Sequence, residues 1–103
     1  MQNTLDFGNA SARERFLRFH NENPHVYAAL VRYARELKRA GVQRAGIRLL
    51  WERLRWDETI RTSGVPFKMS DHHTSFYSRL IMLKERDLMD FFDTRKGCHV
   101  ESN

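Results

Sequence analysis

Cysteine is nearly absent from this chain: Cys98 is the only one among 103 residues, so no internal disulfide can form. Motifs that carry enzyme chemistry are also missing, because the sequence contains no G-x-x-x-x-G-K phosphate loop, no C-x-x-C or H-E-x-x-H metal spacing and no G-x-S-x-G elbow. No apolar run approaches the roughly 20 residues that span a bilayer, and the first residues lack the basic start of a signal peptide. We therefore expect a cytoplasmic protein that has no cofactor, binds no metal, touches no membrane and is not an enzyme.

Positive charge is concentrated in the middle of the chain. The formal net charge is +5 at pH 7. Between Arg32 and Arg86 basic residues outnumber acidic residues by roughly two to one, whereas the two flanks together are net acidic. Such a distribution suits a surface that binds the phosphates of a nucleic acid, and it also suits a surface that grips an acidic protein.

Apolar residues recur at helical spacing in several segments. Four helices are expected, over residues 11–20, 23–40, 46–60 and 70–84. Asn23 is expected to cap the second helix, Gly41 to end it, and Gly64 to turn the chain after the third. A last helical turn is expected from Asp87 to Phe92. The pattern predicts an all-α domain, a compact bundle of four to five short helices with a helix-turn-helix-like arrangement.

The length predicts a single domain. Residues 11–93 are expected to form the helical domain, with a flexible N-terminal segment over 1–10 and a flexible tail over 94–103. Trp51 lies on the apolar stripe of the third helix and is expected in the core. Two points stay open: residues 44–48 could include a short strand, and Trp56, which lies off the stripe, could be exposed or cover a second contact.

The fourth helix is the centre of the binding hypothesis. In helix-turn-helix proteins the second helix enters the major groove with its N-terminal part, and unpaired N–H groups at a helix start favour an anion. The predicted nucleic-acid-binding residues are five basic residues for phosphates and five residues of the fourth helix, namely Arg44, Arg48, Arg55, Arg61, Lys68, His72, His73, Thr74, Ser75 and Arg79.

Other interpretations of these residues stay open. The expected connection before the fourth helix has about ten residues, whereas the motif typically has three or four. In a second register the helices on either side of Gly41 form the motif, although Leu37 then stands where a small residue would let them cross closely. His72 and His73 could also be plain surface residues near a helix cap, and arginines on helices often do no more than face solvent.

Three stretches carry a recognisable pattern: FHNENPHVY over 19–27, IRLLWERLRW over 47–56 and FKMSDHHTSFYSRL over 67–80. With them, the segment from Phe16 to about Arg95 resembles a group of small proteins encoded by bacteriophages and prophages. These proteins carry an asparagine-rich opening where this chain has residues 70–73, followed by a similar T-S-x-Y-x-R-L. The resemblance implies a phage or bacterial cytoplasmic setting, and it implies no activity.

The sequence thus predicts a small phage-type regulatory protein that binds nucleic acid, with duplex DNA as the expected partner. The alternative is an interaction protein that inhibits an acidic host protein, such as a defence or transcription component. A purely structural helical homo-oligomer is a third possibility. Met89, Phe91 and Phe92 could form a dimer interface or close the core of a monomer, so a monomer and a homodimer both remain compatible with the sequence.

Overall fold

The structure is a computed structural model that describes residues 3–65 and 67–93. The elements, in chain order, are α1 (Asn3–Glu22), α2 (Pro24–Arg39), α3 (Ile47–Arg61), the 3-10 turn η1 (Asp71–His73), α4 (Thr74–Lys84) and the 3-10 turn η2 (Arg86–Leu88). Over these ranges there is no strand, only an isolated β-bridge. The prediction of an all-α helical bundle is confirmed. Among the described helices, none combines the length and the apolar character of a bilayer-spanning segment.

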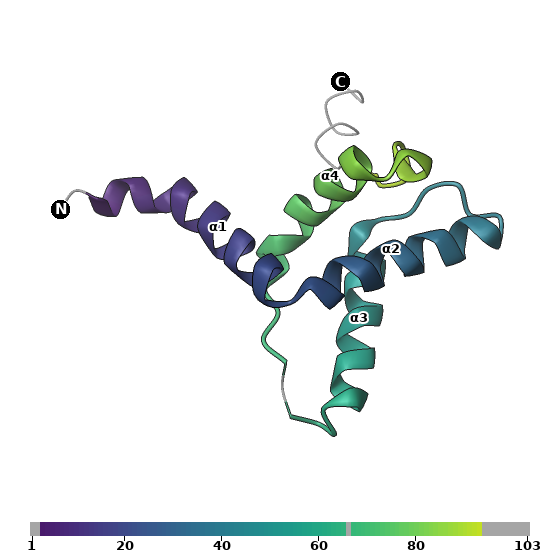
Figure 1. Ribbon diagram of the computed structural model, residues 1–103, viewed down its shortest axis with the longest axis horizontal. Coiled ribbons are helices and arrows are strands. Elements are labelled where there is room, and N and C mark those ends of the chain that lie inside the picture. Colours follow the sequence, from purple (N-terminus) through teal and green to yellow (C-terminus); the bar gives the residue numbers. More distant parts are fainter. Residues whose placement is uncertain (1–2, 66, 94–103) are drawn as a thin grey trace.

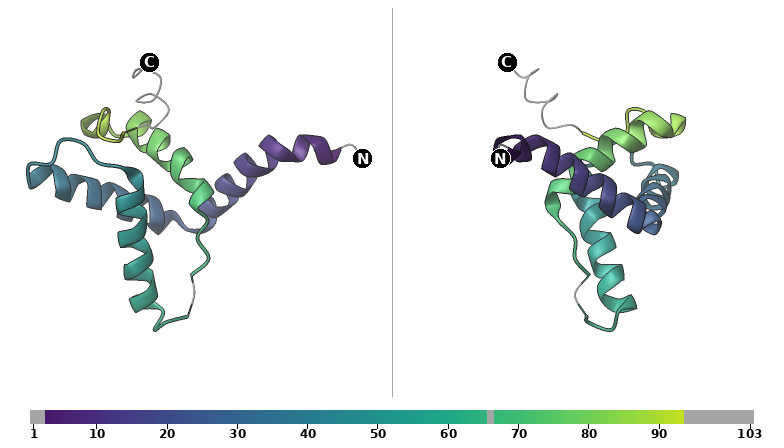
Figure 2. Two further views of the ribbon diagram at one scale, coloured as in Figure 1. Left: turned by 180° about the vertical axis from the view of Figure 1, so that it is seen from behind. Right: turned by 60° about the vertical axis from the view of Figure 1, so that its left-hand side comes forward.

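Helix α2 lies across the middle of the molecule, and α1, α3 and α4 all contact it (Figure 1). Helix α3 also packs against α4. The N-terminal part of α1 extends away from the other helices, as the two further views in Figure 2 show. The C-terminal part of α1 reaches the core through Phe16, which is buried, and through Phe19.

Buried side chains from all four helices form one hydrophobic core. They include Phe16, Val26, Leu30, Tyr33, Ile47, Leu50, Trp51, Leu54, Tyr77, Ile81, Leu88, Phe91 and Phe92. Burial of each large side chain contributes about 1.5–3 kcal/mol. Helices of this length are marginal in water on their own, so the shared core holds them in place. Trp51 is 0% exposed, which confirms its predicted place in the core.

Glycines end α2 and α3 as predicted. Gly41 has a φ of +100° and Gly64 a φ of +91°, a left-handed conformation that residues with a Cβ atom rarely adopt. After α3, the backbone N–H of Gly64 donates a hydrogen bond of 2.8 Å to the carbonyl of Thr59. This bond satisfies one of the free carbonyls at the end of the helix.

Two helix starts differ from the prediction. Helix α1 begins at Asn3 and not at Ser11. The first residues were expected to be flexible, but the glycine and asparagines before Ser11 each cost a helix interior only about 1 kcal/mol or less. Asn23 precedes α2 as expected, yet its side-chain amide donates to the carbonyl of Phe19 at 3.0 Å. It therefore satisfies the end of α1 and makes no side-chain cap on α2.

The chain after α4 closes the core. In place of the helical turn expected from Asp87 there is the 3-10 turn η2, followed by a parallel bridge between Phe92 and Ala45. The N–H of Ala45 donates to the carbonyl of Phe91 at 3.0 Å, and of the short strand left open for residues 44–48 there is only this bridging residue. Phe91 and Phe92 are each 2% exposed and belong to the monomer core, whereas Met89 is exposed. Cys98, the tail over 94–103 and Pro66 lie outside the described residues.

One arginine of α2 forms ion pairs with the segment that follows α4. The guanidinium of Arg35 lies 2.8 Å from the carboxylate of Glu85 and 2.9 Å from that of Asp87. Lys38 donates to the carbonyl of Asp87 at 2.6 Å, and the hydroxyl of Tyr27 donates to Glu85 at 2.8 Å. Arg35 therefore holds η2 against α2. It does more than face solvent.

Candidate nucleic-acid interface

The 3-10 turn η1 leads directly into α4, and the two together form the opening of the helix. The hydroxyl oxygen of Ser70, the residue before η1, accepts a hydrogen bond of 3.2 Å from the backbone N–H of His72. The hydroxyl of Thr74 donates to the carbonyl of Asp71 at 2.9 Å. Polar side chains of this opening thus satisfy backbone groups of the turn itself, as is typical of serine and threonine at helix starts.

Three of the predicted residues lie on one exposed side of this segment. His72, Ser75 and Arg79 follow one another at spacings of three and four, and all three are exposed. Side chains at these spacings share one face of a helix. The guanidinium carbon of Arg79 lies 5.6 Å from the ring centre of Phe76, an arrangement that orients the cation along the helix surface. These residues remain candidates for contacts with a ligand.

His73 and Thr74 are not on that side. They are only 7% and 8% exposed, so the prediction that they contact nucleic acid is corrected. The ring of His73 stacks on Phe19 at 4.8 Å between centroids, and the Thr74 hydroxyl is used by the backbone. The correction could have been found in the sequence, because His73 precedes Tyr77 and Ile81 by four and eight residues and so lies on their buried face.

Two arginines of α3 converge on the opening of α4. A guanidinium nitrogen of Arg55 lies 3.0 Å from one carboxylate oxygen of Asp71, and a guanidinium nitrogen of Arg48 lies 3.7 Å from the other. The Nε of Arg55 also lies 3.3 Å from Glu52. The side chain of Asp71 is 48% exposed, so these pairs are accessible to solvent. We call Arg48, Arg55, Asp71 and His72 the Asp71 cluster.

Positive charge also reaches this place from α1. Burial lowers the pKa of His73, and the charges of His72 and Arg15 lower this pKa further. The charge of an α1 residue thus acts on a residue at the start of α4.

The remaining predicted phosphate-binding residues lie elsewhere on the surface. Arg44 precedes α3 and lies 3.3 Å from Asp93, next to the β-bridge. Arg61 lies at the last residue of α3 and donates to Glu58 at 3.0 Å, at the end of the helix that projects from the bundle (Figure 1). Lys68 is exposed in the connection that leads to η1. The structure therefore gathers only part of the predicted set.

Carboxylates of α3 pair with arginines of the same helix. The pairs within this helix are Glu52 with Arg55, Asp57 with Arg53 and Glu58 with Arg61. Glu58 is 5% exposed and also lies 3.7 Å from His25. Over the described ranges, no three histidine, cysteine, aspartate or glutamate side chains come together as a metal site would require.

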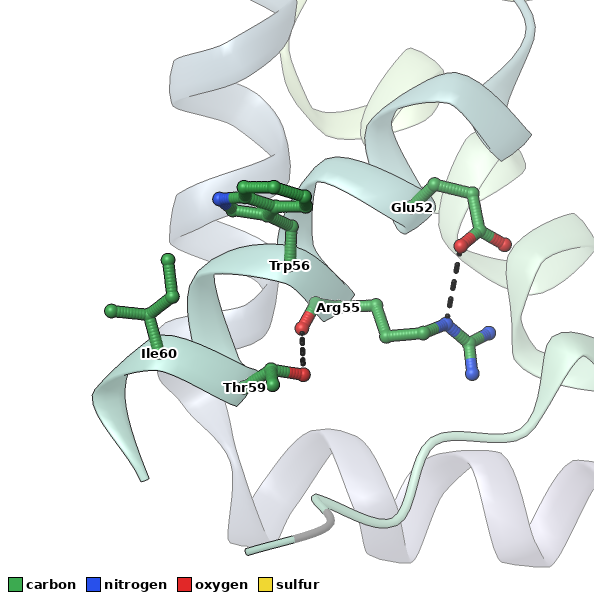
Figure 3. A pocket seen from close by; sticks show the side chains of 5 residues that line it. All are labelled: Glu52, Arg55, Trp56, Thr59 and Ile60. Carbon is green, nitrogen blue, oxygen red and sulfur yellow. Dashed lines mark hydrogen bonds and ion pairs between the residues drawn. The ribbon is translucent and has the colours of Figure 1, made fainter. Parts of the chain in front are cut away.

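A hollow lies on the outer side of α3. It has a volume of about 330 Å³ and is lined by Glu52, Arg55, Trp56, Thr59 and Ile60 (Figure 3). The sequence left open whether Trp56 is exposed, and the structure decides it: the side chain is 68% exposed. The sequence-based prediction did not include Trp56 among the binding residues, and its position off the apolar stripe was compatible with exposure and with a second contact.

The buried His73 makes the stability of the fold depend on pH. Because its folded-state pKa is lowered, the unfolded chain takes up the proton first as the pH falls. The stability is complete above the ordinary histidine pKa of about 6.5 and decreases as the pH falls through that value toward the lowered folded pKa. His20 adds to this effect, since burial and the charge of Lys84 lower its pKa as well.

When the pH is lowered from about 7.5 to about 5.5, the free energy of unfolding should decrease less in the His73→Phe variant than in the wild type. Urea denaturation at both pH values measures this. The exposed His25 provides the control, because the stability of His25→Gln should depend on pH as steeply as that of the wild type. An equal pH dependence in the wild type and in His73→Phe would contradict the assignment to His73.

Comparisons with known proteins do not indicate a function, so a function has to be inferred from the geometry of the site. No protein family, no curated protein and no solved structure matches this chain.

Proposed function

We propose that this protein binds nucleic acid through the surface around the Asp71 cluster, and that it acts by binding and without catalysis. The observation that supports the proposal is the convergence of Arg48 and Arg55 on the opening of α4. Next to them His72, Ser75 and Arg79 form an exposed polar face along the helix. Guanidinium groups bind phosphate oxygens strongly, often through two parallel hydrogen bonds.

The charge cluster supports this proposal better than the helix-turn-helix motif does. The connection between α3 and η1 covers residues 62–70, which is longer than the three or four residues of a typical motif. Phosphate contacts position a protein on a nucleic acid without reading its sequence. A role as a phage regulatory factor belongs to the same proposal.

The proposal is tested by measuring affinity for duplex DNA, single-stranded DNA and RNA over a range of salt concentrations. Each neutralised phosphate releases about 0.9 counterion from B-DNA, so log affinity should fall linearly with log salt. An affinity that stays the same at low and moderate salt, or that is absent at both for all three probes, would contradict the proposal.

Asp71→Asn should bind nucleic acid about two- to fivefold more tightly than the wild type at low salt. The substitution removes the carboxylate that occupies both arginines, and an exposed ion pair of this kind is worth only about 0.2–1 kcal/mol. Fluorescence anisotropy with a labelled oligonucleotide measures the change. Asp90→Asn is the matched control, since Asp90 is an exposed carboxylate in the segment that follows η2. Equal gains in both variants would show an effect of net charge alone.

A second candidate function is supported by a different observation. Leu49 and Ile60 on the outer side of α3 are 59% and 64% exposed, and apolar side chains on a helix surface are typical of contacts with another protein. Under this alternative the basic surface binds an acidic host protein. Pull-down from nuclease-treated lysate distinguishes the two, because a stoichiometric protein that survives the treatment supports the alternative.

A further inference from the structure

Helix α3 carries two tryptophans with opposite environments. Trp51 is 0% exposed in the core, whereas Trp56 is 68% exposed on the outer side of the same helix. An indole ring is the largest apolar side chain, and soluble proteins usually bury most of it. The exposed indole is therefore a surface that a flat ligand can cover.

The hollow beside Trp56 has a mixed chemical character. Its lining residues follow at spacings of three and four along α3, so they form one continuous patch of the helix surface. Trp56 and Ile60 supply an apolar wall, and Arg55 and Glu52 lie on the other side of the patch (Figure 3). A volume of about 330 Å³ is at the lower end of the range for small-ligand sites. It suits one flat ring system better than a protein helix.

Arg55 connects this hollow with the Asp71 cluster. Its side chain lines the hollow, and its guanidinium lies 3.0 Å from Asp71 at the opening of α4. A phosphate held at the cluster would therefore lie next to the hollow. In a nucleotide the base is attached to the phosphate through one sugar, so the same nucleotide can contact both places.

We infer that Trp56 is a stacking platform for an unpaired base, and that the preferred ligand is single-stranded nucleic acid. This inference rests on the proposed function and names its ligand. Bases in a duplex are stacked inside it and offer no face to Trp56, whereas an unpaired base does. Exposed aromatic rings beside arginines are how single strands are commonly bound, with the ring holding the base and the cation holding the backbone.

Tryptophan fluorescence and affinity test the inference. Adding a short single-stranded oligodeoxythymidylate should quench the fluorescence of Trp56, while a blunt-ended duplex of the same length should quench it little. Trp56→Leu keeps an apolar side chain but removes the aromatic face, and it should lower affinity for the single strand about fivefold or more. Trp56→Phe should retain most of the affinity, and binding of the duplex should change little in both variants.

Leu49→Ala is the matched control, because Leu49 is exposed on α3 but does not line the hollow. It should leave the affinity for the single strand unchanged. Salt-dependent binding that is equal for both probes and insensitive to Trp56→Leu would overturn this inference and leave the proposed function intact. Absence of salt-dependent binding to any nucleic acid would overturn both. A protein partner lost in Trp56→Leu, with single-strand affinity unchanged, would assign the surface to protein docking.

Discussion

Replacing Arg48 and Arg55 together by glutamine is expected to weaken nucleic-acid binding about tenfold at low salt and to reduce the salt slope by about two. Each arginine neutralises one phosphate in the proposed complex. Each lost contact therefore lowers the number of counterions released on binding by about one. The fold should be preserved, because the side chains of Arg48 and Arg55 are 65% and 41% exposed and solvent-accessible ion pairs contribute at most about 1 kcal/mol. Anisotropy titrations at several salt concentrations measure both effects.

The matched control is the double variant Arg39→Gln and Arg86→Gln. It removes the same charge from exposed positions at the end of α2 and in η2, away from the opening of α4. If the Asp71 cluster holds the phosphates, this control keeps most of the affinity and of the salt slope. Equal losses in the two double variants would mean that net charge alone drives binding, and the assignment to the cluster would be wrong.

Trp51→Ala is expected to lower the free energy of unfolding by about 3–5 kcal/mol. The indole is 0% exposed and contacts aromatic side chains of two other helices, with ring centres 5.9 Å from Tyr77 and 6.4 Å from Phe19. Alanine would leave a cavity where α1, α3 and α4 meet. Small domains have a total stability of about 5–15 kcal/mol, so the loss could leave much of the protein unfolded. Urea denaturation followed by circular dichroism measures it.

Trp56→Ala removes the same side chain from the exposed side of α3 and serves as the control. Surface substitutions of this kind usually change stability by less than about 0.5 kcal/mol. The two variants should therefore differ by several kcal/mol although they delete identical atoms five positions apart. Similar stabilities for both would contradict the burial of Trp51 or the exposure of Trp56 in the folded protein.

Local sequence patterns predicted the helices well. Pro24 is the first residue of α2, and Gly41 and Gly64 follow the ends of α2 and α3 by two and three residues, because proline suits a helix start and glycine readily adopts a left-handed turn. Two local predictions failed. Helix α1 begins before Ser11, and the side chain of Asn23 bonds to the preceding helix and does not cap α2.

The candidate site was predicted only in part. Polar residues at the start of the fourth helix looked equivalent in the sequence, but the helix buries one side and exposes the other. His72 is exposed and His73 is buried, since neighbouring residues on a helical segment point in different directions. Nor did the sequence predict that Asp71 would pair with Arg48 and Arg55. The connection over residues 62–70 lies between them, and local patterns do not determine its path.

By itself, the sequence determined the all-α class, the buried face of α2 and α3, the core position of Trp51 and the excess of positive charge. These follow from helical periodicity and composition, which act over a few residues at a time. Only the tertiary structure decided which cations meet at the opening of α4, that Arg35 holds η2 against α2 and that Trp56 is exposed. Each of these depends on contacts between helices that are far apart in sequence, and packing of the whole core places such helices side by side.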